Sequence, residues 1–270
     1  MAKPNQIELQ TGERIPILYE DRSVLAIDKP RGWMLAPVSW HNTGRNLQAA
    51  LMSSIAARDF WARSRNLKYL RFVHRLDADT SGILLLAKSP GAVDTFGSLF
   101  ESRNMEKVYL AVVRGAPKQS EWTCRRKLAP DPSARGTMKV DARHGKEAET
   151  HFRVLQSDGK TTLVEARPVT GRTHQIRVHL AESGHPVVGD GLYGPEPGKD
   201  AFHRVPFIPG KVRDAVERVL TIPEARFRES ALGLRAVGLA YVDPFTRRRV
   251  EICAPLEGFV REYGFDLPRL

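Results

Sequence analysis

An unbroken apolar run in the first third of the chain, Ile83–Ala87, is short and has no polar alternation. Such a run predicts a strand that is buried on both faces. It follows a charged stretch, residues 71–79, so we expect these charges to lie at the mouth of a core strand. Between them, residues 80–82 predict a turn, in which Gly82 tolerates backbone angles or close approaches that a side chain would block.

Helical spacing of apolar residues predicts three helices that pack one face each. Ser89 is a suitable N-cap for the second helix because a proline follows it. The third helix is predicted to start from a cap at Thr170 or Thr173 and to end near Ser183. The first helix is expected over residues 46–57.

Strand patterns cover most of the remaining chain and predict a single large domain, residues 17–270. Residues 1–16 are expected to be a short polar extension, and residues 118–148 to be extended hairpins or loops that grip RNA. Residues 195–230 form an insertion of unassigned purpose, with prolines followed by helical spacing. The strands are predicted at residues 17–28 (with a turn at 20–23), 107–113, 149–155 and 161–167, and as a pair around residue 243.

Composition limits the class of protein. The chain has 270 residues, is 41% hydrophobic and carries a formal charge of +11, which favours a polyanionic partner without choosing between RNA, DNA and a membrane surface. Cys124 and Cys253 are far apart, so they predict neither a disulfide framework nor a zinc site. No run is long and apolar enough for a membrane span, and no targeting segment is recognisable. We expect a soluble cytoplasmic protein.

Cations and aromatic residues are interleaved upstream of the buried strand. Guanidinium groups pair with phosphates and rings stack on unpaired bases, so this combination suits RNA. A run of charge is also typical of a solvated face, and the two interpretations remain open here. The residues are Arg58, Phe60, Trp61, Arg63, Arg65, Lys68, Tyr69, Arg71, Phe72 and Arg75.

Two carboxylates, Asp77 and Asp79, lie in the charged stretch. From composition alone, such carboxylates are most often caps for backbone N–H groups in a turn. The string His74–Gly82 (HRLDADTSG), however, resembles the signature of the RluA family of pseudouridine synthases, and Gly171–Leu180 (GRTHQIRVHL) resembles a second signature of that family. The resemblance covers roughly residues 17–194 and 231–257.

The resemblance implies an α+β fold of the pseudouridine synthase type: a large, mixed, mainly antiparallel sheet flanked by helices and loops around a central cleft. It also assigns the catalytic residues. Asp77 corresponds to the catalytic carboxylate, because that position directly follows Arg-Leu, and Asp79 falls at a variable position where it could cap the turn. Tyr109, in the segment KVYLAVVRG, corresponds to the tyrosine that packs against the target base and has been proposed as its proton acceptor. Arg177 corresponds to the arginine that pairs with the carboxylate.

The same signatures suggest residues that contact the RNA. Arg75 resembles the residue that fills the site vacated when the target nucleotide is extruded. The other candidates come from the two signature blocks and are His74, Thr80, Arg172, His174 and Gln175. The family usually has histidine at the position of Arg235, so the contact made there is in doubt. No segment resembles the S4 RNA-binding domain that some relatives carry.

The implied activity is isomerisation of specific uridines in structured ribosomal or transfer RNA to pseudouridine. Asp77 would attack C1′ or the uracil ring, or assist loss of the 2′ proton, and these three routes stay open. Nothing is oxidised or hydrolysed, so no metal or cofactor is expected, and a monomer without DNA or membrane partners is expected. The alternatives are a catalytically silent RNA-binding protein of this fold and a base-excision glycosylase, which also extrudes a base and uses a carboxylate.

Overall fold

One mixed sheet runs through the part of the chain that the structure, a computed structural model, describes: residues 3–35, 45–134, 136–194 and 231–268. Its strands follow the order β1-β2-β3-β5-β12-β6-β11-β10-β7, with β13 paired to β12 and β4 paired to β5. Only the β5–β12 pair is parallel among the described strands. The strands β8 (Leu128–Pro130) and β9 (Met138–Val140) form a separate pair.

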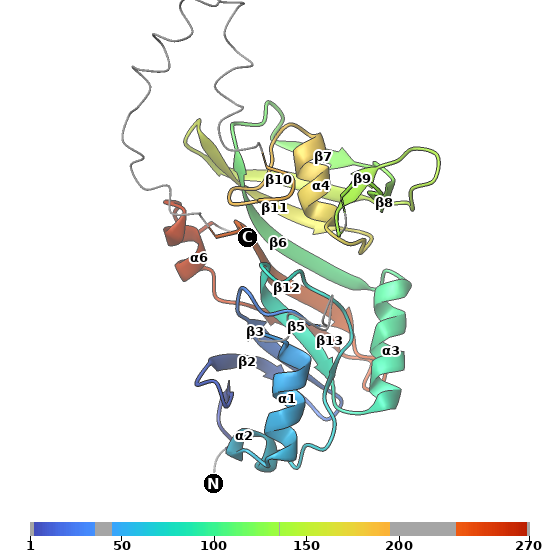
Figure 1. Ribbon diagram of the computed structural model, residues 1–270, viewed down its shortest axis with the longest axis vertical. Helices are drawn as coiled ribbons and strands as arrows, with labels where there is room; N and C mark the ends of the chain where they lie inside the picture. Colours follow the sequence, from blue (N-terminus) through green and yellow to red (C-terminus); the bar gives the residue numbers. More distant parts are fainter. Residues whose placement is uncertain (1–2, 36–44, 135, 195–230, 269–270) are drawn as a thin grey trace, which may run out of the picture.

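The elements follow in chain order as a run of strands broken by short helices (Figure 1). The described helices are α1 (Leu47–Ala56), α2 (Phe60–Arg63), α3 (Pro90–Glu101), α4 (Gln175–Glu182) and α6 (Glu257–Glu262). The strands of the large sheet are β1 (Gln6–Glu8), β2 (Arg14–Glu20), β3 (Val24–Lys29), β4 (Arg71–Phe72), β5 (Ser81–Ala87), β6 (Met105–Arg114), β7 (Glu121–Cys124), β10 (Thr150–Ser157), β11 (Thr161–Pro168), β12 (Leu234–Val242) and β13 (Arg249–Cys253).

The molecule has two halves that share this sheet (Figure 1). One half carries β1, β2, β3 and β5 with α1, α2 and α3, and the other carries β7, β10 and β11 with α4 and the β8–β9 pair. The long strand β6 and its neighbour β12 run from one half into the other. This arrangement confirms the predicted α+β architecture, in which a mainly antiparallel sheet is flanked by a few helices.

Several predicted boundaries are corrected by the structure. The extension predicted at residues 1–16 is corrected over its described part, residues 3–16, because β1 pairs with β2 and the side chains of Ile7 and Ile15 are fully buried. The sequence did not predict β1 because it is only three residues long and two of the three are polar. The insertion at residues 195–230 lies outside the described residues. No described helix combines the length and apolarity needed to cross a membrane.

The helix α4 starts differently from the prediction. Neither Thr170 nor Thr173 caps it; His174 precedes the helix with a left-handed backbone (φ 53°) and no side-chain cap. The side chain of Gln175 folds back instead, and its Oε1 accepts hydrogen bonds from the Arg172 amide (2.9 Å) and the Thr170 hydroxyl (2.7 Å). The N-cap predicted at Ser89 is confirmed, since its hydroxyl accepts the Ala92 amide.

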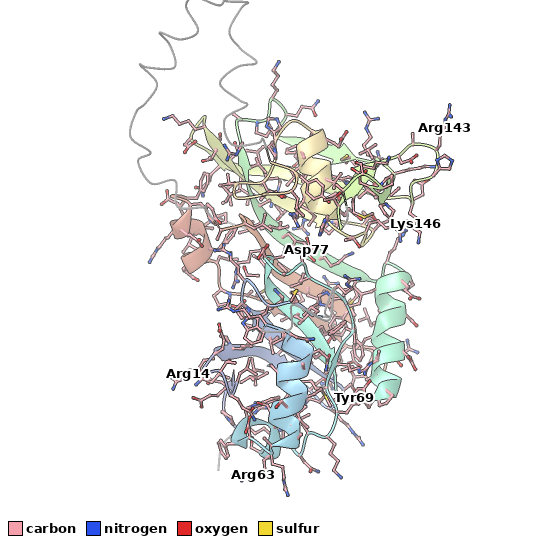
Figure 2. The ribbon with its side chains drawn as sticks, in the orientation of Figure 1. Arg14, Arg63, Tyr69, Asp77, Arg143 and Lys146 are labelled. Carbon is pink, nitrogen blue, oxygen red and sulfur yellow. The ribbon has the colours of Figure 1, made fainter. Side chains whose placement is uncertain are left out.

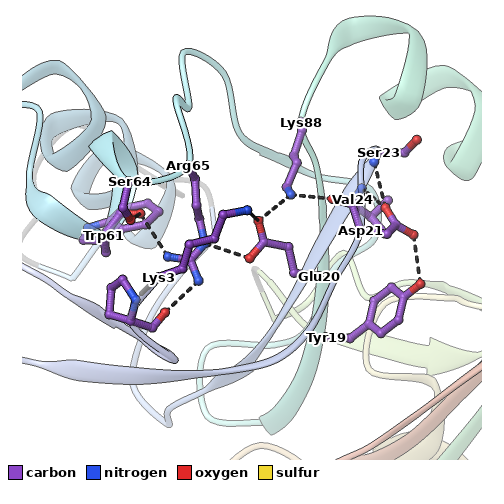
Figure 3. Close-up of polar contacts among 11 residues, drawn as sticks. Lys3, Tyr19, Glu20, Asp21, Ser23, Val24, Trp61, Ser64, Arg65 and Lys88 are labelled. Atoms are coloured by element: carbon purple, nitrogen blue, oxygen red, sulfur yellow. Dashed lines mark hydrogen bonds and ion pairs between the residues drawn. The ribbon is translucent and has the colours of Figure 1, made fainter. Parts of the chain in front are cut away.

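Part of the cation-rich segment upstream of β5 is structural. The Arg65 guanidinium is buried and binds Glu20 (2.8 Å) and the backbone oxygens of Pro4 and Trp61 (Figure 3). Lys88 binds the other oxygen of Glu20, and together these cations lower the pKa of that carboxyl group against the effect of its burial. Trp61 lies in the core. The solvated or RNA-facing interpretation therefore applies only to the remaining cations of the segment.

Arg235, where the family usually has histidine, connects three elements. Its guanidinium binds Asp28 at the end of β3 (2.7 Å), the Ser81 hydroxyl at the start of β5 (3.3 Å) and the carbonyl oxygen of Pro255 (3.1 Å). Arg235 therefore joins the end of β3, the start of the buried strand β5 and the segment at Pro255.

Gly82 allows β5 and β12 to approach each other. It lies inside β5, not in a turn before it, and has a positive φ of 108°. It pairs with Ala236 of β12, and a Cβ at this position would overlap the Ala236 backbone. The turn lies one step earlier, where the Thr80 amide binds the Asp77 carbonyl oxygen (3.2 Å). The close approach predicted for this glycine is present.

Replacing Gly82 with alanine is therefore expected to lower the free energy of unfolding by roughly 2 to 4 kcal/mol, from backbone strain and overlap. Gly97→Ala is the matched control, because Gly97 lies inside α3 and no atom lies within 4 Å of the place that a Cβ would occupy there. Alanine should there stabilise the helix by about 0.5 to 1 kcal/mol. Urea unfolding of both variants measures the difference, and similar values for the two would contradict this account.

Candidate active site

A cavity of about 540 Å³ opens where the two halves of the sheet meet. Four segments and Leu234 of β12 line it: residues 73–80 before β5, the end of α3 with the following loop, the start of β6, and residues 168–177 leading into α4. Asp77 lies at this junction (Figure 2). Segments distant in sequence therefore place two carboxylates, Asp77 and Glu101, several cations and one tyrosine around a common space.

Arg177 links three parts of the chain through two carboxylates. Its Nη1 binds Asp77 Oδ2 at 3.2 Å, while Nε and Nη2 bind the two oxygens of Asp190 at 2.8 and 2.7 Å. The Asp190 side chain is fully buried, whereas that of Asp77 is 25% exposed. Asp190 therefore serves as the fixed anchor of the guanidinium, and Asp77 is the carboxylate that a substrate can reach.

The charges of this cluster reinforce each other. Burial acts to lower the pKa of Arg177, but the hydrogen bonds and charge of Asp190, followed by those of Asp77, raise it above its usual range. Burial likewise acts to raise the pKa of Asp190, and Arg177 with the amides of Leu192 and Tyr193 lowers it. The Arg177 guanidinium is thus held between two carboxylates. It makes a bidentate pair with Asp190 and a single hydrogen bond with Asp77.

A second cation fixes the backbone around Asp77. The ammonium group of Lys29, which is fully buried, donates to the carbonyl oxygens of Ala78 (2.8 Å), Thr80 (2.9 Å) and Pro30 (3.1 Å). Two of these carbonyls flank Asp77 on its C-terminal side. Burial lowers the pKa of Lys29 to about 8, although Asp79 and Asp77 act in the opposite direction. Lys29 therefore ties the end of β3 to the loop that presents Asp77.

His174 lines the cavity beside Asp77, and Tyr193 holds its ring. The Tyr193 hydroxyl accepts the Met138 amide (2.8 Å) and pairs with His174 Nδ1 at 2.7 Å. Burial lowers the pKa of His174, so a neutral ring that accepts the tyrosine proton carries its own proton on Nε2. That nitrogen faces Asp77 Oδ1 at 3.8 Å. The Tyr193 ring also lies against the Arg177 guanidinium, 5.1 Å from its centre.

Tyr109 lies on β6 and lines the cavity. Burial, assisted by the nearby charge of Asp77, raises the pKa of its hydroxyl well above the usual value. No hydrogen-bond partner for this hydroxyl is found among the described residues, so it remains available to a ligand. The group is a neutral phenol at physiological pH.

Comparison with known proteins places this site in a family. A family model described as RNA pseudouridylate synthase matches residues 23–182. The ribosomal large subunit pseudouridine synthase C of Vibrio cholerae is 32% identical over 249 residues, which are 91% of this chain and 67% of that protein. The dual-specificity RNA pseudouridine synthase RluA of the same organism is 35% identical over 182 residues, 67% of this chain and 69% of that protein. The chain belongs to the RluA family of RNA pseudouridine synthases.

Solved structures agree with this assignment. The structure of human RNA Pseudouridylate Synthase Domain Containing 1 has a TM-score of 0.62 and 28% identity, covering 89% of this chain and 83% of that one. Human RNA Pseudouridylate Synthase Domain Containing 4, at 22% identity and a TM-score of 0.68, shares the fold. The chain spans 67% and 65% of the length of the first two curated relatives that it matches.

Three residues that the family resemblance predicts to contact RNA differ in their exposure at the cavity. Arg75 is exposed and lines the cavity, and Arg172 lines it while its Nε binds the Glu147 carbonyl oxygen (2.9 Å). The Thr80 side chain is buried at the cavity wall, and its hydroxyl has no partner among the described residues. Arg75 and Arg172 therefore leave donor groups available to a bound nucleotide, whereas the Thr80 oxygen is itself buried.

Two other predicted contacts also line the cavity, but the protein itself uses most of their hydrogen-bonding groups. His74 accepts the Leu85 amide through Nε2 (3.0 Å) and stacks on Phe100, and burial lowers its pKa to about 3. The Gln175 amide binds Thr170, the Arg172 amide, Thr150 and the Glu149 carbonyl oxygen. Both residues hold the cavity walls in place.

The sequence analysis missed Asp190, Lys29 and Tyr193 as functional residues. Asp190 and Tyr193 lie near the end of the segment 17–194 that resembles the family, and Lys29 directly follows the strand predicted at residues 17–28, but no role was predicted for any of them. A partial signal existed for Asp190, since a buried arginine needs more than one carboxylate oxygen to satisfy its five donors. Asp79, predicted as a cap, is exposed, and no hydrogen bond of its carboxylate is found among the described residues.

We expect Asp190→Asn to lower the free energy of unfolding by about 3 to 5 kcal/mol at pH 7, since it leaves a buried guanidinium with half of its charge partners. Because the folded-state pKa of Asp190 is lowered, this stabilisation is complete above the unfolded-state pKa near 4 and is lost as pH falls through the lower folded value. The deficit relative to wild type should therefore shrink below about pH 4.

Urea unfolding at pH 7.5, 5.0 and 3.5 measures this dependence. Glu106→Gln is the control, because the pair of Glu106 with Arg249 is exposed on both sides and should contribute little. A deficit for Asp190→Asn that stays constant across these pH values would show that its charge is not the source of the stabilisation.

Proposed function

We propose that this chain isomerises uridines in structured RNA to pseudouridine, with Asp77 as the catalytic carboxylate. The observation that carries the proposal is the carboxylate at a cavity wall, 25% exposed, held by an arginine whose other donors are bound to a buried aspartate. Such an arrangement holds a reactive oxygen in one position before the substrate arrives.

The chemistry is a rearrangement within one nucleotide. The bond from C1′ to N1 of uracil breaks, the base turns, and C1′ bonds to C5. C5 then loses its proton and N1 gains one, so mass and oxidation state are unchanged. Because the uridine is hidden by stacking in folded RNA, the nucleotide must first be extruded into the cavity. Arg75, exposed at its edge, is suited to occupy the space that the base leaves.

Tyr109 is proposed to pack against the base and to take part in proton transfer. Its hydroxyl stays protonated because burial raises its pKa. A phenol in this state accepts the C5 proton only if it passes its own proton on. We therefore favour a relay through the Tyr109 hydroxyl over a phenolate base.

Large-subunit ribosomal RNA is the proposed substrate, because the curated relatives of Vibrio cholerae and Escherichia coli that match most of the chain are named ribosomal large subunit pseudouridine synthases. Transfer RNA is the second candidate, since a relative named for dual specificity also matches. We also propose that the protein acts as a monomer in the cytoplasm. Pseudouridine mapping of total RNA from a strain that lacks the protein, compared with its parent, identifies the target position.

Asp77→Asn keeps the size of the side chain and removes its charge, so it should abolish pseudouridine formation while leaving the protein folded. Asp79→Ala is the matched control two residues away, and because Asp79 is exposed it should retain activity and nearly unchanged stability. Carbodiimide labelling of product RNA followed by primer extension measures activity, and thermal melting checks the fold. Activity in Asp77→Asn, or release of free uracil by wild type, would contradict the proposal.

The β8–β9 region is proposed to grip RNA through its exposed cations. Arg143 and Lys146 extend from this part of the molecule (Figure 2), and neither has an ion-pair partner among the described residues. Arg125 and Lys127, in contrast, pair with Glu149 and Glu147 at 3.0 Å. The predicted RNA-gripping role of residues 118–148 is therefore assigned to the first pair.

Replacing Arg143 and Lys146 together by glutamine should reduce the slope of log affinity against log salt by about 1.5, because each phosphate contact contributes roughly 0.7 to 0.9. The double replacement of Arg125 and Lys127 removes the same charge and should change the slope less. Both slopes are measured by filter binding of the target RNA fragment. The titration runs from about 50 to about 300 mM KCl, because salt in this range weakens phosphate contacts. Equal slopes for the two variants would refute the assignment.

A further inference from the structure

Lys107 is a cation at the cavity wall that the protein itself leaves mostly unpaired. It lies two residues before Tyr109 on β6, so both side chains emerge on the same face of the strand, toward the cavity. Its Nζ donates to the Thr170 carbonyl oxygen at 3.1 Å. No carboxylate lies within ion-pair distance of it among the described residues. Two of its three N–H donors are therefore unused.

An unpaired ammonium in this position costs free energy. The side chain is only partly exposed, and burial lowers its pKa to about 8. His74 gives it no compensation, since the positive charge of Lys107 acts with burial to keep that ring neutral. A charged group taken from water without a partner is destabilising, so an anionic ligand would recover the lost solvation.

We propose that Lys107 binds a phosphate group of the extruded target nucleotide, and so holds the ribose while Asp77 reacts. The inference rests on the proposed function, because it takes a nucleotide as the occupant of the cavity. A phosphate suits the site better than a uracil oxygen does, since a full negative charge offsets the desolvation of an ammonium ion and a neutral carbonyl does not. An extruded nucleotide also brings its own 5′ and 3′ phosphates to the cavity.

The neighbouring geometry leaves room for this group. Residue 171, next to the Thr170 carbonyl that Lys107 binds, is a glycine, and even a Cβ there would lie 4.0 Å from the Lys107 ammonium. The Arg177 guanidinium is not available for a phosphate, because two carboxylates already occupy it. Lys107 and Arg172 are therefore the partly buried cations of the cavity that have unused donors, and of these two Lys107 lies beside Tyr109 on the same face of β6.

Binding of uridine 3′,5′-bisphosphate tests the proposal without requiring the RNA target. Wild type should bind it at least tenfold more tightly than uridine in a calorimetric or NMR titration. Lys107→Met should lose most of this advantage and Lys107→Arg should keep it. Lys160→Met, which removes an exposed charge from the distant β10–β11 turn, should behave as wild type. An equal advantage in wild type and Lys107→Met, or no phosphate-dependent binding by wild type, would overturn the proposal.

The pH dependence gives a second readout. The lysine must be protonated to bind phosphate, so affinity of wild type should fall above about pH 8, while Lys107→Arg should hold its affinity to pH 9.5. The other titratable groups around the cavity, His74, Asp77, Glu101, Tyr109 and His174, are the same in both proteins and so cancel in the comparison. The same loss with pH in both proteins would contradict the proposal.

Turnover of RNA separates this role from the chemistry. Lys107→Met should raise KM at least tenfold on an RNA fragment that wild type modifies, and a methylphosphonate in place of the target phosphates should raise KM for wild type but not further for the variant. An effect on kcat alone would place Lys107 against the base and refute phosphate binding. If wild type modifies no RNA, the proposed function fails, and the bisphosphate titration still decides the role of Lys107.

Discussion

The site depends on one guanidinium that bridges the two halves of the sheet. Asp77 belongs to the loop before β5 in one half, whereas Arg177 and Asp190 belong to α4 and the loop after it in the other. The strands β6 and β12 fix the distance between the halves, and Gly82 permits the close contact between β5 and β12. The position of the reactive carboxylate is therefore set by the packing of the whole sheet, and not by its own loop alone.

The two carboxylates on Arg177 divide structure from reactivity. Asp190 accepts hydrogen bonds from two of the guanidinium nitrogens and from the amides of Leu192 and Tyr193, so both of its oxygens are engaged. Asp77 receives a single hydrogen bond on one oxygen, and the other oxygen faces His174 at 3.8 Å. The two hydrogen bonds to Asp190 satisfy the buried Arg177 guanidinium. The single hydrogen bond to Asp77 therefore orients that carboxylate and leaves it free to meet a substrate. A symmetric pairing would have protected both carboxylates from a substrate.

The sequence predicted what is local or carried by an unbroken motif. The buried run after Gly82, the cap at Ser89 and the contact between Arg177 and Asp77 are present, the last because a long signature carried it. What it missed depends on contacts between distant segments. The three-residue strand β1 is stable only by pairing with β2, and α4 starts without a threonine cap because Gln175 folds back on its own loop. Charge patterns alone also could not separate the buried Arg65 from exposed neighbours.

The number of N–H donors that the protein itself pairs distinguishes structural cations from cations that can bind a ligand. Lys29 donates its three N–H groups to three backbone carbonyls, and the Arg177 guanidinium donates to two aspartates. Removing either would leave buried acceptors without partners, which is a structural loss. Lys107 has the same lowered pKa as Lys29 but one acceptor. Burial therefore has a structural role at Lys29 and a proposed ligand-binding role at Lys107. The unused N–H donors of Lys107, more than its lowered pKa, indicate where a substrate would bind.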